Sequence, residues 1–109
     1  MESNEAYRNP NLTLAELADL SGTHPRAVSR IVNQEFGMNF NDFVNHHRVE
    51  AVKLAFARKE HERITLLAIA LDCGFNSKTT FNRAFKKSTR LSPRAYLENI
   101  PLESPQDAN

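Results

Sequence analysis

Apolar residues recur along most of the chain at intervals of three or four positions, the period of a helix that buries one face. No stretch alternates apolar and polar residues as a half-buried strand does, and no Asn-Gly or Asp-Gly pair marks a hairpin. The longest helical pattern runs from Asp42 to Lys59, through the apolar positions Phe43, Val44, Val49, Val52, Ala55 and Phe56. These patterns predict an all-α fold of about seven helices.

Residues that begin and end helices separate these patterns. Thr13 and Glu16 have the spacing of a capping box, in which each side chain binds the backbone amide of the other residue. Pro25 fits the first turn of the next helix, and Gly22 and Gly37 fit helix ends. Further helices are predicted to begin at Asn39, Thr65, Ser77 and Ser92. The buried stripes of the first two helices are predicted to be Leu14, Leu17, Ala18 and Leu20, then Val28, Ile31, Val32 and Phe36.

The chain contains an internal repeat. The pattern Thr13-Leu14-x-x-Leu17-Ala18-x-x-x-Gly22 recurs 52 residues later as Thr65-Leu66-x-x-Ile69-Ala70-x-x-x-Gly74. With one residue inserted, Val28, Arg30 and Val32 correspond to Phe81, Arg83 and Phe85. Each copy predicts a helix, a tight turn with glycine and a second helix, as in a helix-turn-helix that places its second helix in the DNA major groove. A helical hairpin that serves only packing is the alternative, but two copies favour the first interpretation.

The predicted helix between the copies could space them for DNA. Residues 42–59 would span about 27 Å at about 1.5 Å per residue, and successive major-groove segments on one face of B-DNA lie about 34 Å apart. Bending the DNA, at about 1–6 kcal/mol, could absorb the difference. The sequence thus predicts four parts: a first helix-turn-helix subdomain (1–38), a connecting helix and linker (39–60), a second subdomain (61–100) and a disordered tail (101–109).

The net charge of +1 indicates nothing about a partner, but the charges are unevenly distributed. Between Cys73 and Leu97 there are six basic residues and no acidic one, a pattern typical either of a phosphate-binding surface or of a solvated helix face. The single cysteine cannot form an internal disulfide, and the longest apolar run, residues 66–71, is too short to span a bilayer. The first residues do not resemble a secretory signal, so we expect a cytoplasmic protein without membrane contact in this segment.

The second copy resembles the signature of AraC/XylS-type bacterial transcription regulators through Gly74-Phe75, Ser77, Phe81-x-Arg83-x-Phe85-Lys86 and Ser92-Pro93-x-x-Tyr96. The rest of the chain is similar to the family through Pro25-Arg26, Ser29-Arg30, Asn39-Phe40 and Arg48-Val49. The resemblance covers residues 11–97 and implies a DNA-binding domain with two helix-turn-helix motifs.

The resemblance also implies partners. They are double-stranded promoter or operator DNA and RNA polymerase, met at the bacterial nucleoid, and no cofactor is expected. The family usually joins this domain to a sensing or dimerisation domain. We therefore expect the chain to be a C-terminal fragment that lacks such an N-terminal domain.

The chain departs from the family pattern at three positions. His24 replaces a frequent serine cap, Arg90 replaces a turn glycine, and Leu97 replaces a basic residue after Tyr96. Loss of a good cap costs about 1 kcal/mol, and Arg90 places a Cβ where a positive φ is expected. These departures concern local stability and leave the DNA-reading positions intact.

Polar residues lie opposite the predicted buried stripe on the second helix of each unit. Those predicted to read base edges are Arg26, Ser29 and Arg30 in the first unit and Lys78, Thr79, Asn82 and Arg83 in the second. Arginine can bind O6 and N7 of guanine with two hydrogen bonds, and asparagine can pair with adenine. As alternatives, Ser29 is merely exposed and Arg83 bridges an acid on a neighbouring helix.

A second set of residues is predicted to contact phosphates and so to position the domain without specifying sequence. These residues are Asn33, Arg48, Thr65, Ser77, Lys86, Lys87, Ser92 and Arg94. Thr65, Ser77 and Ser92 belong to the set because helix N-termini offer backbone amides to phosphate. For Arg48, the sequence leaves open an internal salt bridge instead.

No other chemistry is indicated by the sequence. The histidines, His24, His46, His47 and His61, lack the spacing of metal ligands, and no constellation of nucleophile and base suggests an enzyme. Cys73 is predicted to be a small buried hydrophobic residue. The rival hypothesis is a helical protein–protein interaction module without sequence-specific DNA binding. The basic second helix of the second unit argues against that rival.

Overall fold

The computed structural model describes residues 3–99, and within them it contains six α-helices, two short 3-10 segments and no strand. In chain order, the elements are η1 (Ser3–Arg8), α1 (Leu14–Leu20), α2 (Pro25–Phe36), α3 (Phe40–Ala57), η2 (Glu60–Glu62), α4 (Leu66–Asp72), α5 (Lys78–Thr89) and α6 (Pro93–Asn99). This confirms the predicted all-α fold, with one α-helix fewer than the seven expected. The predicted disordered tail lies outside the described residues.

Local capping residues set the ends of the helices as predicted. The Thr13 hydroxyl accepts a hydrogen bond from the Glu16 amide, and the Glu16 carboxylate accepts one from the Thr13 amide, both at 3.0 Å. The Asn39 side chain caps α3 in a similar way, so α3 begins at Phe40 and ends at Ala57. The start directly after Asn39 agrees with the predicted cap, and the end lies two residues before the predicted Lys59.

Two of the departures from the family pattern have the predicted local effect. The His24 side chain makes no capping hydrogen bond to α2, so this helix lacks about 1 kcal/mol of capping free energy. Arg90 follows α5 with φ at +68°, in the left-handed region that favours glycine.

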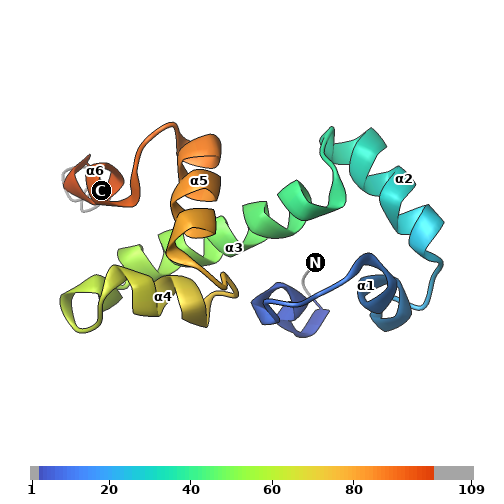
Figure 1. The fold of residues 1–109 in the computed structure, drawn as a ribbon, viewed down its shortest axis with the longest axis horizontal. Coiled ribbons are helices and arrows are strands. Elements are labelled where there is room, and N and C mark those ends of the chain that lie inside the picture. Colours follow the sequence, from blue (N-terminus) through green and yellow to red (C-terminus); the bar gives the residue numbers. More distant parts are fainter. Residues whose placement is uncertain (1–2, 100–109) are drawn as a thin grey trace, which may run out of the picture.

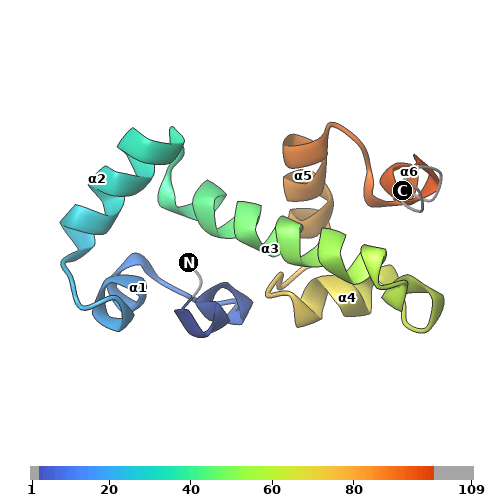
Figure 2. The ribbon, with the colours of Figure 1, turned by 180° about the vertical axis from the view of Figure 1, so that it is seen from behind.

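The long helix α3 connects two helix pairs (Figure 1). The pair of α1 and α2 lies at the N-terminal end of α3, and the pair of α4 and α5 packs around its C-terminal half. In Figures 1 and 2, α2 lies above α1 and α5 lies above α4. The second helices of the two pairs are therefore on the same side of the molecule.

Each helix pair has its own hydrophobic core on α3. The first core contains Leu17, Ala18, Val28, Val32, Phe43 and Val44. The second contains Val49, Val52, Ala55, Phe56, Ile69, Ala70, Cys73, Phe75, Phe81 and Phe85. Ala18 and Ala70 are almost completely buried, as expected where two helices approach closely. Among residues 5–99, no buried side chain belongs to both cores.

Three residues predicted to be buried are half exposed: Leu20 at 54%, Ile31 at 52% and Phe36 at 52%. In α2 only the stripe of Val28 and Val32 is covered, and Ile31 points about 100° away from Val32 because helical residues are 3.6 per turn. Phe36 is the last residue of α2, and the centroid of its ring lies 4.9 Å from that of Phe43. Within residues 3–99, no helix combines the length and apolar character needed to cross a membrane.

Candidate nucleic-acid interface

In the first unit, α2 presents a polar surface on the side opposite its buried stripe. Arg26, Arg30 and Asn33 are exposed, and Ser29 is half-buried. Pro25 occupies the first position of the helix and Gly37 ends it. Among residues 5–99, no hydrogen bond or ion pair occupies the side chains of Arg26 and Arg30, so both guanidinium groups can bind an external partner.

The polar surface of α5 in the second unit is larger. Lys78, Thr79, Asn82, Arg83 and Lys86 are all exposed, whereas Phe81 and Phe85 are buried. Within the described residues 5–99, no acid pairs with Arg83. The alternative in which Arg83 bridges an acid on a neighbouring helix therefore finds no support within that range.

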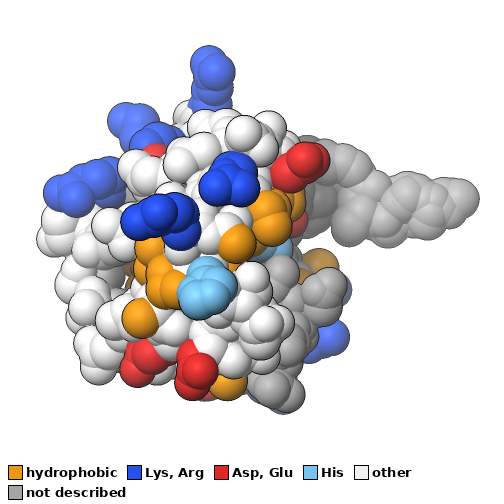
Figure 3. Space-filling view, turned by 90° about the vertical axis from the view of Figure 1, so that its right-hand side faces the viewer, with side chains coloured by type: hydrophobic (Ala, Val, Ile, Leu, Met, Phe, Trp, Pro, Cys, Tyr) orange, Lys and Arg blue, Asp and Glu red, His pale blue; other side chains and the backbone are white. Residues whose placement is uncertain are grey.

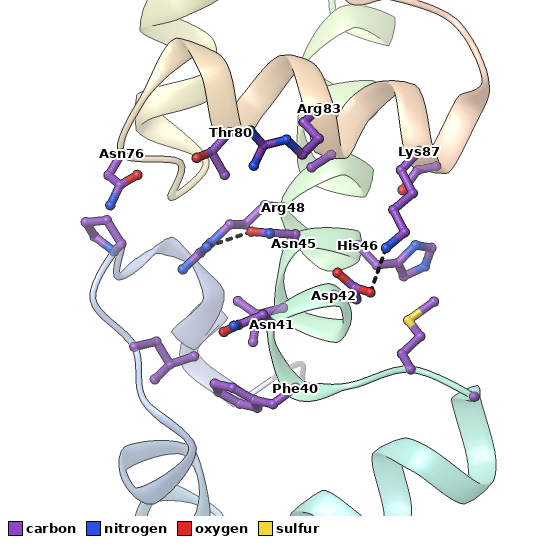
Figure 4. A pocket seen from close by; sticks show the side chains of 17 residues that line it. Phe40, Asn41, Asp42, Asn45, His46, Arg48, Asn76, Thr80, Arg83 and Lys87 are labelled. Atoms are coloured by element: carbon purple, nitrogen blue, oxygen red, sulfur yellow. Dashed lines mark hydrogen bonds and ion pairs between the residues drawn. The ribbon is translucent and has the colours of Figure 1, made fainter.

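A cleft of about 890 Å³ separates α5 from the first turns of α3 and the turn that joins α2 to α3. Figure 4 shows Thr80, Arg83 and Lys87 on its α5 side and Asp42, Asn45 and Arg48 on its α3 side. Gly37 and Met38 border it at the end of α2. Asp42 is the only acid among the lining residues, beside Arg48, Arg83 and Lys87, so the cleft has a basic lining that suits an anionic ligand.

Lys87 contacts Asp42 across this cleft. The distance from Lys87 Nζ to Asp42 Oδ2 is 2.8 Å, and the lysine side chain remains 66% exposed. An exposed pair of this kind contributes about 0–1 kcal/mol, so a phosphate could displace the carboxylate. Lys87 therefore stays available for the predicted contact with a phosphate, which would compete with Asp42 for its ammonium group.

Arg48 lines the cleft, but internal partners occupy its guanidinium. Only 9% of Arg48 is exposed. It donates hydrogen bonds to the carbonyl oxygens of Tyr7 at 2.7 Å and Asn9 at 2.8 Å, and to Asn45 Oδ1 at 2.9 Å. Burial lowers the pKa of Arg48. The predicted phosphate contact is wrong for Arg48. Among residues 5–99 Arg48 does not form the internal salt bridge either, because its partners there are two backbone carbonyls and an amide.

The remaining phosphate candidates lie at helix starts or on the surface. Thr65, Ser77 and Ser92 each accept a hydrogen bond from an amide of the helix that they begin. Asn33, Lys86 and Arg94 are exposed. These positions leave the phosphate prediction open for all six.

Basic side chains are conspicuous at the end of the molecule that α1 and α2 form. Figure 3 shows Lys and Arg side chains over the upper half of this end, and acidic side chains along its lower edge and at its upper right. The upper half is the level of α2 in Figure 1, and the lower half is the level of α1. Within the unit, α1 carries Glu16 and Asp19 and no basic residue, whereas α2 carries Arg26, Arg30 and one acid, Glu35.

The polar residues that α3 contributes to the cleft, above all Asn45, were not predicted from the sequence. The spacing of Asn45 and Arg48, three positions apart on one helix, is a signal that could have paired them. The N-terminal segment around Tyr7 and Asn9, whose carbonyl groups bind Arg48, was not predicted either. Backbone carbonyls have no signature in a sequence.

The arrangement of the two helix pairs defines a class of protein, the double helix-turn-helix domain. Sequence comparison agrees with this class. A family described as a helix-turn-helix domain matches residues 17–99. A Staphylococcus aureus (strain COL) protein described as an uncharacterised helix-turn-helix-type transcriptional regulator is 31% identical over 97 residues, 89% of this chain and 13% of that protein. A Haemophilus influenzae protein described in the same words is 35% identical over 89 residues, 82% of this chain and 28% of that protein.

Solved structures show the same fold. The C-terminal domain of the two-component response regulator yesN from Fusobacterium nucleatum has a TM-score of 0.67 and 26% identity, covering 86% of this chain and 88% of that one. The C-terminal domain of AraT, a response regulator from Geobacillus stearothermophilus, has a TM-score of 0.66 and 28% identity, covering 84% and 74%.

The chain belongs to the AraC-type helix-turn-helix family, the DNA-binding domains of bacterial transcription regulators. It spans 13% of the length of the Staphylococcus aureus regulator and 28% of the length of the Haemophilus influenzae regulator.

Proposed function

We propose that this domain binds double-stranded DNA sequence-specifically by inserting α2 and α5 into two successive major-groove segments on one face of the duplex. The observation that carries the proposal is that both helices lie on the same side of α3, where Arg26, Arg30 and Arg83 are exposed and form no ion pair among residues 5–99. The 18 residues of α3 span about 27 Å. This length suits two units that act together on DNA with a modest bend.

The proposed roles follow the exposed faces of the two helices. Arg26, Ser29, Arg30, Lys78, Thr79, Asn82 and Arg83 would contact base edges. Asn33, Thr65, Ser77, Lys86, Lys87, Ser92 and Arg94 would contact phosphates. In this scheme residues 1–38 and 61–100 form the two reading units, and residues 39–60 hold them apart.

We further propose that the domain acts in the bacterial cytoplasm, at the nucleoid, as the C-terminal part of a longer regulator. The chain spans only a small share of each relative, which supports its being part of a longer regulator. The two solved domains are each the C-terminal domain of a response regulator, which supports it as well. An N-terminal sensing or dimerisation domain and RNA polymerase would then be its protein partners.

Sites selected from random duplex DNA, followed by fluorescence anisotropy at two salt concentrations, test the proposal. We expect tighter binding to selected than to scrambled DNA. Arg30→Ala and Arg83→Ala should each lose about 1–3 kcal/mol on the selected site and relax its preference at one base pair. Arg63→Ala removes an exposed arginine outside both recognition helices and is the matched control, expected to bind like the unchanged protein.

Two outcomes would contradict the proposal. An equal loss on selected and scrambled DNA would show that the substituted arginine does not read bases. Failure of the unchanged domain to bind any duplex at low salt would favour the protein-interaction alternative.

A further inference from the structure

The two helix-turn-helix units do not share a hydrophobic core. On α3, the first core ends at Val44 and the second begins at Val49, and Asn45 and Arg48 lie between them. If α3 were the only connection, the angle between α2 and α5 would depend on one helix, and long helices are rarely straight. A second connection would restrict that bending.

Residues 5–12, which we term the N-terminal strap, provide this second connection. Ala6, Tyr7 and Leu12 pack against the first core. Arg8 reaches the second unit, where its Nη1 donates a hydrogen bond to the Asp72 carbonyl at 2.8 Å and lies 3.5 Å from Asp72 Oδ2. The strap therefore contacts both units.

Arg48 fastens the strap to the middle of α3. Its Nε and Nη2 bind the carbonyl groups of Tyr7 and Asn9, and its Nη1 binds Asn45. Its Cζ also lies 6.0 Å from the ring centroid of Phe75 in the second unit. A buried charge requires hydrogen-bond acceptors, and the strap supplies two of them, so burial of Arg48 depends on the position of the strap.

Gly74 shows how closely the second unit approaches the strap. This residue ends the turn after α4 with φ at +110°. A Cβ at this position would collide with the Tyr7 carbonyl oxygen and lie 2.8 Å from Arg48 Nε. By contrast, a Cβ at Gly22, the equivalent position of the first unit, would meet no atom within 4 Å. The glycine of the second turn is thus required by the strap as well as by its backbone conformation.

We infer that Arg48 and the N-terminal strap fix the angle between the two units and thereby specify the spacing of the two DNA half-sites. The inference rests on the proposed function and adds a source of specificity that touches no base. Arg48 acts through the strap, so it is a positioning residue. Each base pair added between half-sites rotates one of them by about 34°, since B-DNA has 10–10.5 base pairs per turn. A rigid pair of units should tolerate little of this rotation.

The test measures binding to duplexes whose two half-sites are separated by the optimal spacing or by one or two base pairs more or fewer. For the unchanged domain we expect about a tenfold loss of affinity for each base pair away from the optimum. Arg48→Met keeps the length of the side chain and removes its donors. It should reduce the loss to threefold or less and leave affinity for DNA with a single half-site unchanged within twofold. Arg83→Ala, the control, should weaken binding at every spacing without flattening the profile.

A second variant keeps the inference testable if Arg48→Met does not fold. Arg8→Ala removes the anchor of the strap on Asp72 from a partly exposed position and should flatten the spacing profile less strongly. An unchanged profile in a folded variant of either kind would overturn the inference. So would a parallel loss at all spacings and on single half-sites, because that result indicates general destabilisation. Failure of the unchanged domain to bind DNA would instead overturn the proposed function.

Discussion

Lys87 on α5 and Asp42 in the first turn of α3 form an ion pair, with 2.8 Å between Nζ and Oδ2, at the edge of the basic cleft. The two residues are 45 positions apart in the chain. The pair also places a negative charge where the domain is proposed to approach phosphates.

Asp42→Asn should therefore increase affinity for duplex DNA. We expect a gain of several-fold at low salt, because Lys87 is released and a repulsive charge is removed. The folded state should lose only about 0.3–1 kcal/mol from the pair and from the first turn of α3. Anisotropy titrations and thermal unfolding measure the two effects. Glu50→Gln makes the same change of charge in a pair with Lys53 that does not line the cleft. An equal gain in both variants would show that only net charge matters.

Lys86→Ala should weaken binding to selected and scrambled DNA alike. An exposed lysine that contacts phosphate releases about one counterion on binding, so the slope of log K against log salt should fall by about 1. Titrations at four or more salt concentrations measure this slope. Arg58→Ala, at the exposed end of α3, should leave it unaltered. A normal slope in Lys86→Ala would remove this lysine from the phosphate set.

Arg90→Gly should stabilise the free domain. Arg90 follows α5 with φ at +68°, and a left-handed backbone is strained for a residue with a Cβ. We expect a gain of up to about 1 kcal/mol, or a rise in Tm of about 4–8 °C, in the absence of DNA. Ser88→Gly, two residues earlier and within the helix, should destabilise by about 0.5–1 kcal/mol. A decrease in Tm for both variants would contradict the strain at Arg90.

The buried thiol of Cys73 predicts a loss of stability at alkaline pH. Burial raises the pKa of Cys73 from 9.0 to about 11, so the folded state favours the protonated thiol. The stabilisation is complete below about pH 9 and is lost as the pH rises towards 11, because the unfolded chain ionises first. At pH 10 the loss should be about 1 kcal/mol. Urea unfolding of the unchanged domain and of Cys73→Ala between pH 8 and pH 10.5 measures it.

Cys73→Ala controls for the other groups that titrate in this range. The alanine variant should start less stable, because it leaves a small cavity, and the difference between the two proteins should shrink as the pH rises. A constant difference would show that Cys73 does not titrate differently in the folded and unfolded states. The same burial predicts slow alkylation by iodoacetamide at pH 8.

Local sequence signals predict most of the fold. Caps such as Thr13 and Asn39 act over three residues, so the helix starts follow from the sequence alone. The width of the buried face of a helix cannot be predicted in this way, because periodicity does not tell how many neighbouring elements cover the helix. Ile31 has the spacing of a core residue, yet α1 and α3 cover only the stripe of Val28 and Val32.

The candidate site, like the fold, could be predicted only in part from the sequence. The outward positions of α2 and α5 follow from the helical period and from the buried Val28, Val32, Phe81 and Phe85. The role of Arg48 could not be predicted. Its two backbone partners lie 41 and 39 residues away in the chain, in a segment without apolar periodicity. Contacts between a side chain and remote backbone become visible only when the chain is folded.

The two recognition helices are joined in one chain and carry different outward residues, with Arg26 and Arg30 on one and Asn82 and Arg83 on the other. A dimer of identical units favours palindromes, which read the same on both strands. Two unlike helices in a fixed order would instead favour an asymmetric site. In the proposed binding mode the domain would then face one way along the chromosome. Inverting its site would turn the same protein surface from the downstream gene to the upstream one.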